Sequence, residues 1–170
     1  MRSGGFAAAK SASKTTTNKV LNLIRRMEAE GRSLRSTQDA VRALTGWTRA
    51  YADTVVKTTA STSYSMGRIA QARRLGSRVA PAFEIIGPVD SIARPNHAAA
   101  VGLVAGVHDP IWQTHMPPLG YNCRHSISIV PRSALKRRGL LDENGVVKRR
   151  EPPGFDRAGP DPGFRVAVRV

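Results

Sequence analysis

The chain comprises 170 residues, with 27 lysines and arginines against 12 aspartates and glutamates, so its formal charge at pH 7 is +15. This length suits one ordinary domain with arms and argues against two full domains. The excess positive charge predicts an anionic partner, because self-repulsion opposes compaction until something neutralises it. No apolar stretch resembles a signal peptide at the start or reaches the length of a membrane span, so we expect no membrane partner. Cys123 is the sole cysteine and excludes an internal disulfide, which fits a reducing cytoplasm.

The first segment, residues 1–19, consists mainly of glycine, serine, threonine, alanine and lysine. It offers too little apolar surface to offset the entropy lost on ordering, so we predict a flexible basic arm. Residues 20–30 follow with apolar side chains at helical spacing, and Gly31 supplies a stop. This pattern predicts a short amphipathic helix.

Two further helices are predicted within a helical region that covers residues 20–75. Ser36 and Asp39 have the spacing of a capping box, which indicates a helix that continues to Gly46. Residues 47–75 contain no proline, and their apolar positions recur every three or four residues. We therefore predict one long helix there, held by tertiary packing because its many threonines and serines weaken helix propensity.

Beyond the helices the sequence favours strands. Residues 79–86 have a strand-like apolar bias, and residues 126–130 alternate serine with isoleucine and valine, as in a half-buried strand. Residues 140–147 place a turn-like Asp-Glu-Asn-Gly between two apolar pairs and predict a small hairpin. The expected fold class is α+β, with amino-terminal helices followed by a small antiparallel sheet and a long loop rich in histidine and proline. Residues 76–156 would form the core domain and residues 157–170 a carboxy-terminal tail.

The positive charge is concentrated in the amino-terminal half. Residues 1–80 carry 15 basic and 4 acidic side chains, whereas residues 81–170 carry 12 and 8. No recognition-helix pattern accompanies the basic residues, so we predict contacts to DNA phosphates without base reading. The residues expected to make these contacts are Arg25, Arg26, Arg32, Arg35, Arg42 and Arg49.

Residues 90–125 contain all four histidines and the cysteine of the chain. In order they contain an aspartate, an arginine, a histidine, a glycine, Asp-Pro, a tryptophan, a histidine before Pro-Pro-x-Gly, and Asn-Cys-Arg. This order resembles the Mu F-like domain of phage minor head proteins, and the resemblance extends more weakly over residues 48–156. The residues that carry it are Asp90, Arg94, His97, Gly102, Asp109, Pro110, Trp112, His115, Pro117, Pro118, Gly120, Asn122, Cys123 and Arg124.

The chain departs from the family pattern at His125, where the family has the second cysteine of Cys-Arg-Cys. A histidine in that place conserves ligand capacity. The four side chains with the ligand types of a zinc site are His97, His115, Cys123 and His125. The alternative interpretation is that these histidines and the nearby aspartates hydrogen-bond loop backbone and hold together a segment with little regular structure.

Catalytic chemistry finds little support in this segment. A nuclease would need carboxylates to hold Mg²⁺ or a histidine to activate water, and the segment offers only Asp90 and Asp109 as carboxylates. No further motif supports Cys123 as a nucleophile. We therefore expect that the protein is not an enzyme, with a metal-dependent nuclease or a phage-derived effector that uses the histidines and Cys123 as the alternative. Trp112 is expected to fill a small core beneath Pro117 and Pro118 rather than to line a peptide groove.

The family resemblance implies a function that composition alone does not supply. It implies a minor head protein of a tailed phage, attached near the portal inside the head, contacting packaged DNA and assisting head assembly or genome delivery. The expected partners are the portal protein or other capsid proteins, together with double-stranded DNA bound without sequence preference. The expected location is the virion, with the host cytoplasm during assembly.

Overall fold

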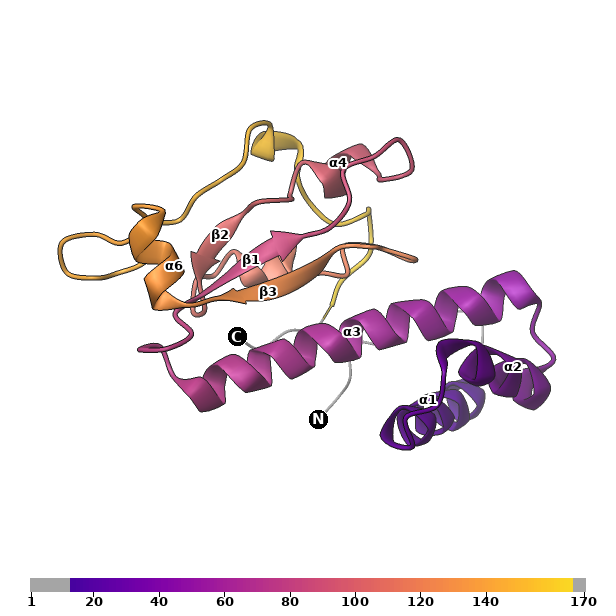
Figure 1. Ribbon diagram of the computed structural model, residues 1–170. Coiled ribbons are helices and arrows are strands. Elements are labelled where there is room, and N and C mark those ends of the chain that lie inside the picture. The colour runs from indigo at the N-terminus through magenta and orange to yellow at the C-terminus, as the bar shows by residue number, and fades with distance from the viewer. Residues whose placement is uncertain (1–12, 167–170) are drawn as a thin grey trace.

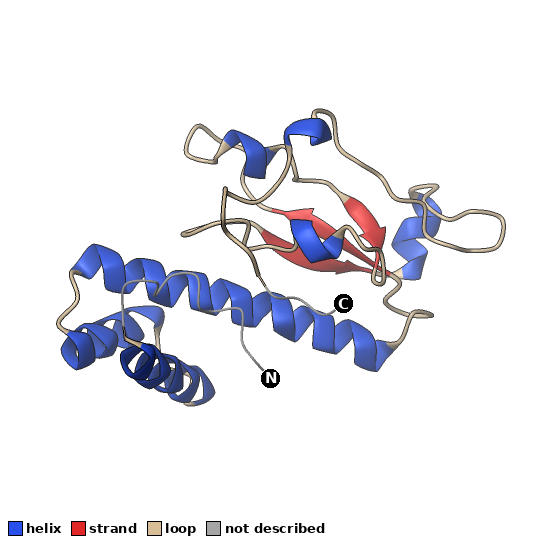
Figure 2. Cartoon of the chain, turned by 180° about the vertical axis from the view of Figure 1, so that it is seen from behind, coloured by secondary structure: helices blue, strands red, loops and turns tan. Residues whose placement is uncertain are grey.

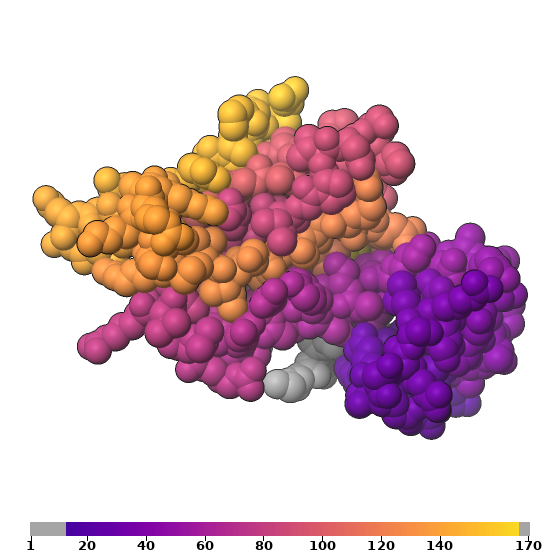
Figure 3. All heavy atoms as spheres, in the orientation of Figure 1, coloured from indigo at the N-terminus to yellow at the C-terminus, as the bar shows by residue number. Residues whose placement is uncertain are grey.

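Three amino-terminal helices begin the fold of the computed structural model, which describes residues 13–166. They are α1 (Lys14–Ala29), α2 (Leu34–Thr45) and α3 (Arg49–Leu75). Helix α2 packs against both α1 and α3, and the three helices form a lobe at the end of the molecule where α3 begins (Figures 1 and 3). The apolar side chains that recur at helical spacing are buried in this lobe as one cluster, made of Val20, Ile24, Val41, Ala52, Val55 and Val56.

The starts of the first two helices differ from the predictions. Helix α1 begins at Lys14, where Ser13 Oγ accepts from Thr16 N at 3.2 Å, so residues 14–19 belong to a helix and not to the predicted arm. Residues 1–12 of that predicted arm lie outside the described residues. The capping box predicted at Ser36 is wrong, because α2 is capped by Ser33, whose hydroxyl accepts from the Ser36 backbone amide at 3.2 Å.

The sheet has three antiparallel strands in the order β2-β1-β3. They are β1 (Ala82–Ile86), β2 (Val104–Gly106) and β3 (Ser126–Val130). The central residue Phe83 pairs with Ala105 on one side and with Ile129 on the other. The α+β class, the long helix and the strand at 126–130 are confirmed, whereas β2 lies inside a segment predicted to be loop.

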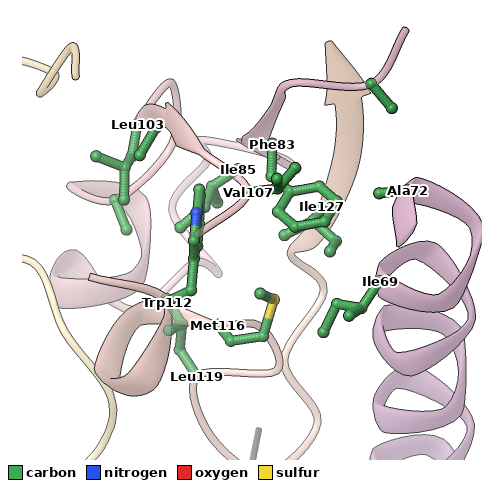
Figure 4. Packing of buried hydrophobic residues seen from close by; sticks show 13 residues of the cluster. Ile69, Ala72, Phe83, Ile85, Leu103, Val107, Trp112, Met116, Leu119 and Ile127 are labelled. Carbon is green, nitrogen blue, oxygen red and sulfur yellow. The ribbon is translucent and has the colours of Figure 1, made fainter. Parts of the chain in front are cut away.

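Successive side chains of each strand point to opposite faces of the sheet, and both faces are covered. On one face Phe83 and Ile85 of β1 and Ile127 of β3 form one buried cluster with Ile69 and Ala72 of α3 (Figure 4). The other face is covered by α6 (Arg132–Arg137) and the hairpin after it, where Leu141 and Val147 pair as predicted. The residues buried between this face of the sheet and α6 form a separate cluster, made of Ala82, Val104, Val130, Leu135 and Leu140.

The remaining elements are short and connected by long loops (Figure 2). Helices α4 (Pro95–Ala98) and α5 (Trp112–His115) are single turns, and a 3-10 helix covers Phe155–Arg157. The carboxy-terminal tail was predicted for residues 157–170, but residues 159–166 pack back onto the domain, where Phe164 and Val166 are buried. None of the helices within residues 13–166 combines the length and apolar character that a membrane crossing requires.

Candidate functional site

Three of the four predicted metal ligands meet at one place. Helix α4 carries His97, and the loop leading into β3 carries Cys123 and His125. Their ligand-capable atoms all lie within 4.8 Å of one another, and Cys123 Sγ is 3.5 Å from His125 Nδ1. The two imidazole rings are edge to face with centroids 5.9 Å apart. We call His97, Cys123 and His125 the His–Cys cluster.

Each imidazole of the His–Cys cluster is held by a hydrogen-bond acceptor at its Nε2 atom. His97 Nε2 lies 3.0 Å from Asp161 Oδ1, and His125 Nε2 lies 3.0 Å from the carbonyl oxygen of Pro88. A neutral imidazole that donates from Nε2 keeps its lone pair on Nδ1. Both histidines are therefore oriented as Nδ1 acceptors or ligands, and the Nδ1 atom of His125 faces the sulfur.

Burial keeps the three groups of the cluster uncharged. It lowers the pKa values of His97 and His125, although Asp161 opposes the change at His97 and the Pro88 carbonyl opposes it at His125. Burial also raises the pKa of the Cys123 thiol, against hydrogen bonds from backbone amides that favour the thiolate. At neutral pH the cluster consists of two neutral imidazoles and a thiol.

Two glycines allow the backbone to approach the cluster closely. A Cβ atom on Gly120 would collide with the Asp161 carboxylate and would lie 3.0 Å from His97 Cε1. A Cβ atom on Gly87 would lie 2.5 Å from His125 Cδ2. Any side chain at these positions would displace a member of the cluster or the carboxylate that orients it.

Ion pairs fasten the loops around the cluster. Arg124 Nη1 donates to Asp90 Oδ2 at 2.9 Å, and this contact lowers the pKa of Asp90 to about 2. Asp90 Oδ1 also accepts from the Ala93 amide at 2.9 Å and closes the turn that leads into α4. Arg94 donates to the Tyr121 carbonyl oxygen at 2.9 Å. The motif residues Asp90, Arg94 and Arg124 thus tie the loop before α4 to the loop before β3.

His115 lies outside the His–Cys cluster. Its Nδ1 atom is 2.8 Å from the Thr114 hydroxyl, its Nε2 atom is 3.3 Å from the Ala158 carbonyl oxygen, and its ring packs on Phe155. Burial lowers its pKa. The interpretation that histidines hold loop backbone together therefore applies to His115.

Trp112 and the two prolines occupy the core, as the packing interpretation predicted. Trp112 is fully buried, donates from Nε1 to the Gly106 carbonyl oxygen at 2.7 Å and packs edge to face on Phe83 (Figure 4). Pro117 and Pro118 are also buried, and a cis peptide bond joins them.

Asp109, the second candidate carboxylate, also has a structural contact. Its Oδ1 atom accepts from the Ile111 amide at 2.9 Å and lies 3.5 Å from Arg149 Nη1. Asp109 and Asp90 are therefore each engaged by an arginine and by backbone amides.

The six arginines predicted to contact DNA lie on or beside α1, α2 and α3, and all except Arg42 are exposed. Arg26 and Arg32 both approach Glu30, and Arg42 approaches Asp39 at 3.4 Å. The other three, which make no ion pair with any described residue, are Arg25, Arg35 and Arg49.

Asp161 is the site residue that the sequence analysis missed. It lies 64 positions after His97, in a segment predicted to be a tail. The only local signals are its position between Pro160 and Pro162, which fix the backbone, and the apolar residues Phe164 and Val166 that follow. These signals predict an ordered segment but do not identify its partner.

The sequence is similar to a known protein family and to two relatives of phage origin. The family model described as "Phage Mu protein F like protein" matches residues 18–128. The chain is 32% identical over 93 residues to the "Putative capsid assembly protein F" of Escherichia phage Mu, covering 55% of this chain and 21% of that protein. It is 32% identical over 87 residues to the "Mu-like prophage FluMu F protein" of Haemophilus influenzae, covering 51% and 21%.

The chain thus spans about a fifth of the length of these two relatives. No solved structure matches it. The family match covers more than half of the chain and includes both the amino-terminal helices and the His–Cys cluster. The chain belongs to the Phage Mu protein F like family.

Proposed function

We propose that this protein is a minor head protein of a tailed phage that assists head assembly or genome delivery. The observation that carries the proposal is the family match over residues 18–128, which includes the motif residues that fasten the sheet domain. The name of the phage Mu relative, a putative capsid assembly protein, supports the same function. We place the protein inside the head near the portal, with portal or capsid proteins as partners, after assembly in the host cytoplasm.

A structural role agrees better with the described side chains than catalysis does. Asp90 and Asp109 are engaged by Arg124 and Arg149, so neither is free to hold Mg²⁺. Burial raises the pKa of the Cys123 thiol, whereas a nucleophilic cysteine needs a lowered one. We infer that the protein is not an enzyme, and we expect plasmid DNA to remain intact when incubated with it in the presence of Mg²⁺ or Zn²⁺.

The proposed contact with packaged DNA is supported by the charge on the helical lobe. Arg25, Arg35 and Arg49 are exposed and have no acidic partner among residues 13–166. Guanidinium groups without a protein partner can bind phosphate oxygens at no loss of an internal ion pair. Contacts of this kind fix position on DNA but do not read sequence.

DNA binding by a triple variant tests this contact. Replacing Arg25, Arg35 and Arg49 by glutamine should weaken binding to duplexes of any sequence. It should also make the salt dependence less steep, by about 0.9 in the slope of log K against log salt for each lost contact. The matched control replaces the same number of positive charges on α6, at Arg132, Lys136 and Arg137. Equal effects of the two triple variants would show that net charge, and not the helical lobe, determines binding.

Head association requires a separate test. Mass spectrometry of purified particles, produced by the phage or prophage that encodes the chain, should detect its peptides at a few copies per particle. Particles in which the portal is omitted should lose the protein if it attaches there. Peptides found only in the soluble lysate, while particles are abundant, would contradict a role in the head.

A further inference from the structure

We propose that the His–Cys cluster is a zinc site, with His97, Cys123 and His125 as the protein ligands and Asp161 as the carboxylate that orients His97. This assignment goes beyond the proposed head function and does not depend on it. Nitrogen and sulfur ligands together favour zinc over magnesium or calcium, which prefer oxygen.

The spacing of the ligand atoms fits a tetrahedral ion. Zn–N and Zn–S bonds of about 2.1 and 2.3 Å at the tetrahedral angle separate nitrogen from sulfur by about 3.6 Å. The Cys123 Sγ atom lies 3.5 Å from His125 Nδ1, and all three ligand atoms lie within 4.8 Å of one another. Cys123 and His125 therefore already have the separation of two ligands on one ion, and His97 offers a third ligand atom within 4.8 Å of both.

The groups behind the ligands match those of known zinc histidines. A ligating histidine usually donates its second ring N–H to a carboxylate or a backbone carbonyl, which fixes the ring. His97 has Asp161 at 3.0 Å and His125 has the Pro88 carbonyl oxygen at 3.0 Å, both at Nε2. The Nδ1 lone pair of each of these two histidines is thus available to bind an ion.

Anionic groups at the site offset the charge of a bound zinc ion. Binding of Zn²⁺ converts the Cys123 thiol into a thiolate, and the displaced proton leaves to solvent. The thiolate and the Asp161 carboxylate together carry two negative charges against the two positive charges of the ion, and the Arg94 guanidinium 3.5 Å from Asp161 adds one positive charge at the partly exposed edge of the site.

The site connects segments that are distant in the sequence. His97 comes from α4, Cys123 and His125 come from the loop before β3, and Asp161 comes from the segment that packs back over the domain. Three protein ligands leave one tetrahedral position for water. Asp161 is engaged by His97 at 3.0 Å and by Arg94 at 3.5 Å, so the carboxylate next to the cluster is not free to act as a general base. We therefore assign the ion to holding the loops together.

Cobalt substitution tests the ligand set. One equivalent of Co²⁺ added to the chelator-treated protein should give the intense visible bands of a tetrahedral site and a thiolate-to-cobalt charge-transfer band. Zinc should displace the cobalt one for one. Cys123→Ser should abolish the charge-transfer band, whereas His108→Gln and His115→Gln, which change histidines outside the cluster, should keep it. Wild-type protein without a charge-transfer band, or a Cys123→Ser protein that retains one, would overturn the proposal.

A second measurement needs no variant, because Cys123 is the sole cysteine. The rate at which a thiol reagent modifies the native wild-type protein should fall at least tenfold with one equivalent of Zn²⁺ and recover when a chelator is added. Mg²⁺ serves as the control and should leave the rate unchanged. A rate that saturating Zn²⁺ does not alter would overturn the site even if the protein is found in phage heads.

Discussion

Substituting Trp112 by phenylalanine removes one ring and one hydrogen-bond donor from the core. The indole is fully buried, packs edge to face on Phe83 at 5.7 Å and donates to the Gly106 carbonyl oxygen at 2.7 Å. That carbonyl also accepts from the Asp109 amide at 2.9 Å, so the substitution does not leave it without a partner.

The expected loss of stability follows from these two contacts. Loss of a hydrogen bond whose acceptor stays satisfied should cost about 1 kcal/mol. The buried carbon atoms removed, and the partly collapsed cavity they leave, should cost about 1–2 kcal/mol more. A total of about 2–3 kcal/mol lowers the Tm of a domain of this size by about 4–12 °C.

Urea unfolding followed by circular dichroism measures this loss, and calorimetry gives the Tm. Trp47→Phe is the matched control, because Trp47 is only half-buried, lies in the helical lobe and packs edge to face on Tyr51 at 4.6 Å. It should cost less than Trp112→Phe. A loss below about 0.5 kcal/mol for Trp112→Phe, within the range of surface substitutions, would refute the reasoning that this residue fills the core.

Gly120→Ala should displace the Asp161 carboxylate and cost about 1–2 kcal/mol in urea unfolding through the lost buried hydrogen bond to His97. Gly67→Ala, in the open middle of α3, should instead stabilise the protein by up to about 1 kcal/mol; equal signs would refute the crowding at Gly120. His115 should titrate below 6.5 by NMR, because burial lowers its pKa. Its neutral form therefore contributes stability that is present above pH 6.5 and lost as pH falls through the lowered value, and His115→Gln should flatten that decline; an identical decline in the variant would contradict this.

Elements with a strong internal pattern could be predicted from the sequence. The alternation in residues 126–130 gives β3 its bounds, and the proline-free repeat after Trp47 gives α3. Strand β2 is only three residues long and exists because β1 offers it partners, so no local pattern marks it. Helix α1 extends back to Lys14 because Ser13 caps it, although the composition of that stretch resembles an arm.

The candidate site could be predicted in its residue types but not in its geometry. The motif contains His97, Cys123 and His125, which the structure brings together, yet His115, the fourth predicted ligand, lies in a different hydrogen-bond network. Asp161 enters only because the chain returns over α4 after the sheet is complete. Spacing along the sequence cannot reveal which of several histidines a folded loop brings together.

Helix α3 belongs to both halves of the molecule at once. Val55 and Val56 near its start help form the core of the helical lobe, while Ile69 and Ala72 near its end pack under the sheet (Figures 1 and 4). Its 27 residues make a rod about 40 Å long at 1.5 Å per residue. Asn122, next to Cys123, donates from its backbone amide to the Thr58 hydroxyl at 3.3 Å and from its side chain to the Thr54 hydroxyl at 3.0 Å. The first half of α3 therefore joins the arginine-bearing lobe directly to the loop that carries Cys123 and His125, and a movement of that lobe would reach the His–Cys cluster without passing through the sheet.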